Sequence, residues 1–235
     1  MKSSPDQIRA RFDADVERFS NLETGQSATI DAPLVLELIT QAAAAVTPHA
    51  RAALDVGCGA GNYALKLLER LPGLDLTLLD LSQPMLDRAL QRVGPATTGR
   101  VRAVQADVRA FDPGLGQYDV IVAAAVLHHL RGEDEWRAVL ARLYHALRPG
   151  GSLWIADLIE HTTPAVQGLM WARYGEYLAA LKGDAYRATV FAYIEQEDTP
   201  RPLLFQLDQL RAAGFAQVEV LHKHSVFAAF GGIKV

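Results

Sequence analysis

From residue 51 onward, short apolar runs alternate with segments of helical period, and this alternation restricts the fold more than any other feature of the chain. The runs have the continuous apolar character of strands that are covered on both faces. They are RAALDV, LDLTLLD, RVRAVQAD, YDVIVAAAV and SLWIADLI. Between the first two, Ala64, Leu67 and Leu71 recur at helical spacing. Strands that alternate with helices form βαβ units, so we expect an α/β protein with a mostly parallel sheet and helices on both faces.

Two segments lie outside the alternation. Near the start, an apolar stripe from Ile8 to Phe19 predicts a helix over residues 5–20, followed by a polar stretch and a second helix over 31–46. Residues 162–200 are too long for a simple connection and too apolar for a linker, which predicts a helical insertion. After a further helix, the last residues read as two strands that turn at HKHS. We therefore expect an antiparallel C-terminal hairpin and seven strands in all.

Composition limits the classes of function. Of the 235 residues, 50% are hydrophobic and 21% are charged, as in a globular protein with ample core. The one cysteine, Cys58, cannot form an internal disulfide, and the opening MKSSPDQIRARF is charged where a secretory signal turns apolar, so a cytoplasmic location is expected. No apolar stretch approaches the ~20 residues of a membrane-spanning helix. The net charge of −4, with scattered Lys and Arg, favours a small-molecule partner over a membrane or a nucleic acid.

The stretch LDVGCGAG places glycines at 57, 59 and 61, just past the first predicted strand. Glycines at such a turn let the backbone bend tightly, let a ligand approach closely, and leave N–H groups of the following helix free to donate. In dinucleotide enzymes the third glycine follows the second by three residues, whereas here the spacing is two. The glycines therefore indicate a nucleotide-like ligand without settling which one.

Acidic residues end the next two predicted strands. Asp80 ends the second and Asp107 ends the third. The carboxyl ends of parallel strands meet at one edge of the sheet, where open α/β proteins bind their ligands. A carboxylate can accept both hydroxyls of a ribose, which predicts that a nucleoside lies at this edge.

Over residues 50–160 the sequence resembles the class I S-adenosylmethionine-dependent methyltransferases. LDVGCGAGNYALKL is similar to their glycine motif, LTLLDLSQPML to their second-strand acid, QADV to the adenine-binding turn, YDVIVAAAVLHHL to the fourth strand, and LRPGG to the turn before the fifth. The resemblance implies a Rossmann-like fold, S-adenosylmethionine as cofactor and S-adenosylhomocysteine as product. It implies one domain over 1–235, made of an N-terminal helical cover at 1–46, a cofactor-binding core at 50–160, a helical lid at 162–200, and a C-terminal helix and hairpin at 203–235.

The same resemblance implies roles for individual residues. Asp80 would accept the ribose hydroxyls, Asp107 the adenine amine, and the backbone at Ala124 would contact the methionine part. Asp55 would brace the glycine loop, and for Met85 a place in the core stays open. The expected cofactor-binding residues are Asp55, Gly57, Cys58, Gly59, Gly61, Asp80, Leu81, Met85, Asp107, Val108 and Ala124.

Methyl transfer requires a positioned nucleophile, and a base where the nucleophile carries a proton. His128, just past the fourth strand, is the predicted general base, with a purely structural role as the alternative. Its neighbour His129 is expected to point elsewhere, because adjacent residues on a turn do not share a face. Phe19, Trp171 and Tyr174 are the predicted substrate contacts, although the last two also fit a packed helix face.

No metal is expected, because Asp157, Glu160 and His161 at the end of the fifth strand read as a solvated strand end. Both ends of the chain resemble the carboxy-S-adenosylmethionine synthases of tRNA modification. Those enzymes carry an arginine where this chain has Gln209, and an asparagine where it has Ala124. We therefore expect methyl transfer to an oxygen or nitrogen of a small molecule. Carboxylate transfer, a non-catalytic cofactor-binding module and a nicotinamide oxidoreductase remain alternatives, and the oligomeric state is left open, a homodimer included.

Overall fold

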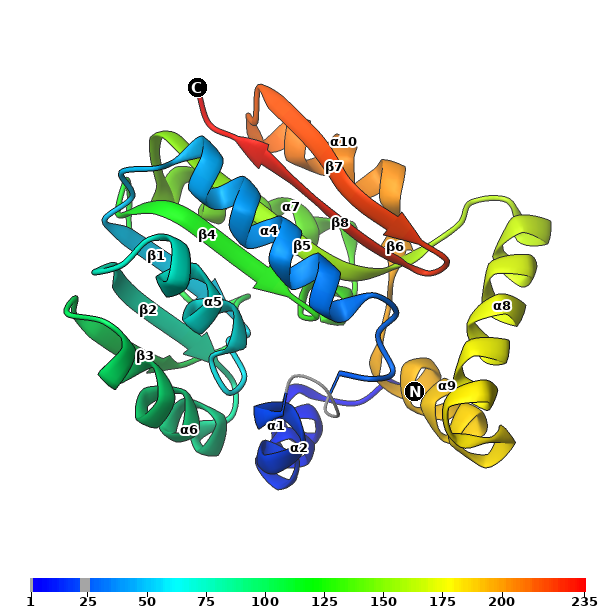
Figure 1. Ribbon diagram of the computed structural model, residues 1–235. Helices are drawn as coiled ribbons and strands as arrows, with labels where there is room; N and C mark the ends of the chain where they lie inside the picture. Colours follow the sequence, from blue (N-terminus) through cyan, green and yellow to red (C-terminus); the bar gives the residue numbers. More distant parts are fainter. Residues whose placement is uncertain (1, 22–25) are drawn as a thin grey trace.

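The structure is a computed structural model that describes residues 2–21 and 26–235 (Figure 1). One sheet runs through it in the strand order β3-β2-β1-β4-β5-β8-β7. Neighbouring strands from β3 to β5 pair in parallel, whereas β8 is antiparallel to both β5 and β7. The strands are β1 (Ala52–Val56), β2 (Asp75–Asp80), β3 (Val101–Gln105), β4 (Tyr118–Ala124), β5 (Leu147–Glu160), β6 (Arg201–Pro202), β7 (Gln217–His224) and β8 (Phe227–Ile233).

This architecture confirms the predicted mostly parallel α/β sheet with an antiparallel C-terminal hairpin. Two details differ from expectation. The two-residue strand β6 pairs with the end of β5 outside the main order, and the sequence carried no sign of it. The hairpin turns at the end of HKHS, where Ser225 adopts the left-handed conformation (φ 50°), while His222 and His224 remain in β7.

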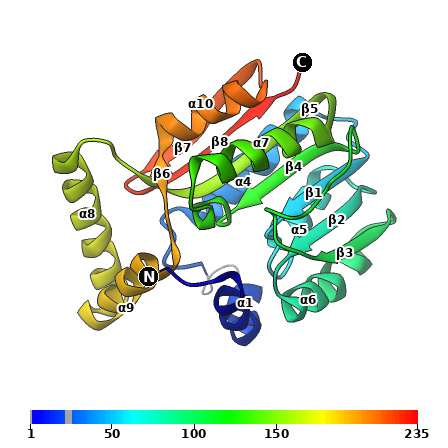
Figure 2. The same cartoon turned by 180° about the vertical axis from the view of Figure 1, so that it is seen from behind.

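Helices cover both faces of the sheet (Figures 1 and 2). One core cluster joins α4, α5 and α6 to one face, and another joins α7 and α10 to the other. Apolar strands buried on both faces are what a parallel sheet requires. The helices are α1 (Pro5–Ala14), α2 (Val16–Ser20), α4 (Ala32–Val46), α5 (Asn62–Arg70), α6 (Gln83–Val93), α7 (Glu133–Ala146), α8 (Pro164–Lys182), α9 (Asp184–Glu197) and α10 (Leu203–Ala213), with 3₁₀ turns η1 (Gly94–Ala96) and η2 (Leu127–His129).

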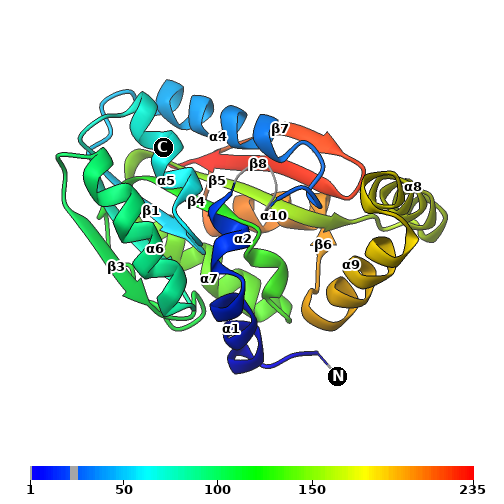
Figure 3. The same ribbon diagram turned by 60° about the horizontal axis from the view of Figure 1, so that its bottom comes forward.

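The N-terminal segment crosses the carboxyl ends of the strands, between α6 and α9 (Figure 3). Ser4 caps α1 by accepting the Gln7 N–H, and Pro5 occupies the first turn. The expected helix over 5–20 is interrupted at Asp15, whose φ and ψ of −109° and 15° separate α1 from α2. Part of the polar connection that follows, residues 22–25, lies outside the described residues.

Residues 162–200 form the two helices α8 and α9, which extend from the sheet beyond the tip of the β7–β8 hairpin (Figure 1). A third apolar cluster holds them, with Tyr174 and Leu178 fully buried in it. The hydroxyl of Tyr174 donates to the carbonyl of Ala28 at 3.0 Å. The helical pair is thus joined to the chain that leads into α4. No helix within the described ranges is both long and apolar enough to cross a membrane.

Candidate active site

The glycine loop between β1 and α5 forms the floor of the site. Gly57 adopts φ +65°, and a Cβ there would lie 2.9 Å from the side chain of Val126. Gly59 adopts φ +50° with open space where a Cβ would stand, so its backbone is accessible from the cavity. Both conformations favour glycine. The loop therefore leaves backbone that a ligand can approach closely.

Asp80 at the end of β2 anchors this loop. Its carboxylate accepts the N–H of Gly59 at 2.8 Å and the N–H of Ser82 at 2.9 Å. Burial raises the pKa of Asp80 above its ordinary value, against the lowering by these two N–H groups. Asp80 also lines the cavity, and a carboxylate has further lone pairs that can accept hydrogen bonds.

Asp107 after β3 already has a partner within the protein. Burial raises the pKa of its carboxylate, but the Arg109 guanidinium and backbone N–H outweigh burial and lower it. Asp107, Val108 and Leu81 line a small cavity of about 40 Å³ together with Ile8 of α1. The first helix therefore covers the position that the sequence assigned to adenine.

A larger cavity of about 350 Å³ adjoins the small one, and the two share Gly57, Asp80 and Leu81 in their walls. That volume suits a small-molecule ligand. Cys58, Met85 and Ala124 also line this cavity. Burial raises the pKa of the Cys58 thiol, so it presents a neutral group. The far wall is mostly aromatic and aliphatic, and it includes Phe12, Phe19, Ile30, Tyr174, Tyr186, Val190, Tyr193 and Phe227.

His128 lies in the wall of the large cavity and is held from behind by Asp157 of β5. Asp157 accepts the backbone N–H of His128 at 3.0 Å, and its other oxygen bonds the ring Nδ1. Burial lowers the pKa of His128, but the charges of Asp157 and Asp198 outweigh burial and raise it to about 9. Asp157 is 4% exposed, so for this residue the expectation of a solvated strand end was wrong.

Asp198, just after α9, completes this polar cluster, which the sequence did not reveal. Its Oδ1 lies 3.5 Å from Nε2 of His128 and 3.4 Å from Nδ1 of His129. Burial raises the pKa of Asp198 to about 6, against the attraction of His128. A backbone hydrogen bond holds Asp198 at this position, because the N–H of the next residue, Thr199, donates to the carbonyl of His128 at 2.7 Å.

The sequence had suggested that His129 points away from His128, and this expectation was wrong. The two ring centroids lie 4.4 Å apart, and both rings line the cavity. The tight 3₁₀ turn of η2 and the approach of Asp198 from outside the turn bring both imidazoles to one carboxylate. Burial, with the neighbouring His128, lowers the pKa of His129 well below its ordinary value, so this imidazole is neutral.

Three predicted site residues are not part of the cavity lining. Asp55 is buried behind the glycine loop, where it accepts the N–H of Ala64 at 3.1 Å and braces the start of α5. Gly61 faces α6, since a Cβ there would lie 2.8 Å from the Val93 side chain. Trp171 packs against Phe191 with ring centroids 5.1 Å apart, because its face of α8 is turned toward α9.

The sequence matches the family described as "Methyltransferase domain" over residues 54–153. A protein of Mycobacterium tuberculosis named an uncharacterized methyltransferase is 33% identical over 118 residues, which are 50% of this chain and 54% of that protein. The aligned part thus spans about half the length of that relative. A carboxy-S-adenosyl-L-methionine synthase of Chromohalobacter salexigens is 32% identical over 186 residues, covering 77% of this chain and 67% of the synthase.

Among solved structures, the chain is similar to the 1,6-didemethyltoxoflavin-N1-methyltransferase of Burkholderia thailandensis, which was crystallised with 1,6-didemethyltoxoflavin and S-adenosylhomocysteine. The TM-score is 0.66 at 18% identity, covering 100% of this chain and 92% of that one. At this identity the likeness shows the fold. Sequence and fold comparisons therefore agree with the architecture described above.

Proposed function

The chain belongs to the class I S-adenosylmethionine-dependent methyltransferases, and from this premise we propose that it transfers the methyl group to an oxygen or nitrogen of a small molecule bound in the large cavity. The observation that carries the proposal is the continuity of that cavity. It begins at the glycine loop and Asp80, where the cofactor is expected, and continues to His128 and Asp198 under an aromatic wall.

The cofactor is proposed to lie along the carboxyl ends of β1, β2 and β4. Its adenosine would occupy the space between Asp80 and Asp107, with Leu81 and Val108 against the base. Its methionine part would follow the backbone of Gly57 and Gly59 toward Ala124. This places the sulfonium methyl toward the large cavity and the acceptor under α1 and α9.

The reaction moves one methyl group and one proton. A lone pair of the acceptor forms a bond to the methyl carbon while the carbon–sulfur bond breaks, and that electron pair stays on sulfur to give S-adenosylhomocysteine. Because the methyl group is already activated, holding the acceptor in line and excluding water accounts for most of the catalysis. We propose that the acceptor's proton leaves toward the polar edge formed by His128 and Asp198, which both line the cavity.

Carboxylate transfer is the second candidate, because the synthase from Chromohalobacter salexigens is similar over most of the chain. Gln209 and Arg211 of α10 do not line the cavity, and Arg211 is paired with Asp208 on the surface. Among the described lining residues of the large cavity, Arg18 is the only Lys or Arg, and it pairs with Asp15 at 3.1 Å. The cavity thus offers little to hold an added carboxylate, which favours methyl transfer.

The test is a turnover assay on the full chain with S-adenosylmethionine and a panel of phenols and heteroaromatic amines, followed by mass spectrometry of cofactor and acceptor. S-adenosylhomocysteine and a methylated acceptor in equal amounts support the proposal. His128→Ala is expected to lower turnover by roughly 10²–10⁴ with cofactor affinity kept. A carboxylated cofactor would instead establish the second candidate. Cofactor binding without turnover on any acceptor would favour a binding module.

A further inference from the structure

We infer that His128, His129 and Asp198 form a binding site for a divalent transition-metal cation such as Zn²⁺, at the acceptor end of the large cavity. One ring nitrogen from each imidazole and one carboxylate oxygen lie within 4.8 Å of one another. Two imidazoles and a carboxylate are a ligand set that such cations accept, with further coordination positions left open. The binding of the cation stands on geometry alone, whereas its part in catalysis rests on the proposed function.

The spacing within the cluster is that of metal ligands. Asp198 Oδ1 lies 3.5 Å from His128 Nε2 and 3.4 Å from His129 Nδ1. Ligands about 2.0–2.1 Å from a tetrahedral Zn²⁺ lie roughly 3.3–3.4 Å from one another. Direct hydrogen bonds between such groups would bring the atoms to roughly 2.7–3.2 Å. The three groups therefore stand close to where a shared cation would place them, and too far apart to satisfy one another.

One oxygen of the buried Asp198 carboxylate has no hydrogen-bond donor among the described residues. Its side chain is 4% exposed, and Oδ1 makes no hydrogen bond with any group in the described part of the chain. A buried carboxylate oxygen without a donor is costly, and a bound cation is one of the arrangements that remove the cost. Asp198 is among the residues that line the large cavity.

Asp157 supplies the second requirement of a histidine ligand. It bonds Nδ1 of His128 and so leaves Nε2 as the nitrogen that faces His129 and Asp198. Histidines that bind metals usually donate their other ring N–H to a carboxylate, which fixes the tautomer and the ring orientation.

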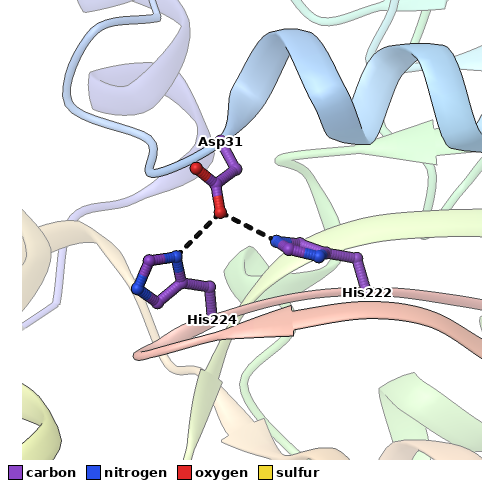
Figure 4. A group of neighbouring side chains, drawn as sticks. All are labelled: Asp31, His222 and His224. Atoms are coloured by element: carbon purple, nitrogen blue, oxygen red, sulfur yellow. Dashed lines mark hydrogen bonds and ion pairs between the residues drawn. The ribbon is translucent and has the colours of Figure 1, made fainter.

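A second group of two histidines and an aspartate gives an internal comparison. Figure 4 shows His222 and His224 of β7 directed at the carboxylate of Asp31, next to the start of α4. Here the nitrogen–oxygen distances are 3.0 and 2.7 Å, which are hydrogen-bond lengths, and both end on the same oxygen. His224 is also half exposed. This group is satisfied as it stands, and we assign it a structural role in holding β7 to α4.

A cation at the cavity cluster would act on the acceptor. An acceptor hydroxyl that fills an open coordination position loses its proton to solvent more readily, and the resulting oxygen anion is held beside the methyl group. In that state His128 and His129 are ligands, and they position the acceptor through the cation. The inference thereby names the acceptor class as one with a hydroxyl that can coordinate a metal.

The test is a titration of the metal-free full chain with Co²⁺, monitored by visible absorption. Co²⁺ with a low coordination number has strong d–d absorption bands in the visible range. We expect saturation at one Co²⁺ per chain and loss of the spectrum on addition of Zn²⁺. His129→Ala and the nearly isosteric Asp198→Asn are expected to lower Co²⁺ affinity at least 10-fold. His224→Ala, in the surface group, serves as the matched control and should leave the titration unchanged.

S-adenosylhomocysteine binding, measured on the same samples, shows that each variant is folded. An unchanged Co²⁺ titration in both cavity variants, or a titration abolished by His224→Ala, would overturn the inference. Methyl transfer at full rate by protein that binds no Co²⁺ or Zn²⁺ would overturn it while leaving the proposed function intact. Cation binding at the cluster without any methyl transfer would leave the site standing and count against the function alone.

Discussion

The carboxylate of Asp157 holds His128 at two points, accepting its backbone N–H at 3.0 Å and bonding its ring Nδ1. Asp157 lies on β5 and His128 follows β4, and these two strands pair in parallel. The ring orientation is therefore set by the centre of the sheet and not by a loop. Any role of His128 at the acceptor depends on this contact.

Asp157→Asn is expected to lower kcat by roughly 10–100-fold, because an amide can hold the wrong ring tautomer of His128. The affinity for S-adenosylhomocysteine should stay the same, since Asp157 lies on the acceptor side. Steady-state kinetics and calorimetry measure the two quantities. Glu160→Gln, at the end of the same strand and outside the cavity lining, is the control. Equal losses in kcat from both variants would contradict a specific role for Asp157.

Asp80→Ala is expected to weaken cofactor binding by about 1.5–3 kcal/mol, the range for a hydrogen bond to a charged group. Its carboxylate would accept the ribose hydroxyls and also fixes the N–H of Gly59. Calorimetry with S-adenosylhomocysteine measures the change. Asp75→Ala at the opposite end of β2 is the matched control, because Asp75 pairs with Arg100 on the surface. Unchanged affinity in Asp80→Ala would place Asp80 outside the site.

The stability of the protein is expected to fall as pH rises from about 4 to about 7. Burial of Asp55 raises its pKa from 3.8 to about 7. In that interval the folded chain holds a proton on Asp55 that the unfolded chain has released, so raising the pH favours unfolding. Above pH 7 this contribution is constant. In Asp55→Asn, the decrease in the free energy of unfolding over this pH interval should be smaller by on the order of a few kcal/mol. Denaturant unfolding at several pH values measures it, and an unaltered slope would rule out Asp55 as the cause.

Cofactor product is expected to slow amide exchange in residues 5–20 and 162–200. Ile8 of α1 lines the small cavity, and Tyr186 and Tyr193 of α9 line the large one. The two segments also contact each other, since the guanidinium of Arg11 pairs with the carboxylate of Glu197 at 2.7 Å. Hydrogen exchange with mass spectrometry, with and without S-adenosylhomocysteine, measures the effect. Protection confined to the strands would show that these helices are not a lid.

The residues proposed to bind the cofactor were within reach of the sequence, because each of them follows a strand of the parallel sheet. Each strand of a parallel sheet ends at the same edge, so Gly57, Asp80 and Asp107 converge whatever the rest of the chain does. The strand pattern also determined the α/β architecture and the C-terminal hairpin. The short strand β6 was not predicted, since two residues carry no periodicity.

The acceptor half was decided by tertiary packing. Asp198 reaches His128 only because the chain after α9 bonds the backbone of η2, a contact between residues 71 positions apart that no local pattern encodes. Helix α8 is apolar around much of its circumference, so the sequence could not tell that Tyr174 faces the cavity while Trp171 packs on α9. The orientation of the His129 ring likewise depends on the nearby carboxylate of Asp198. Contacts between residues of separate helices and strands depend on how those elements pack, so they can be identified only in the tertiary structure.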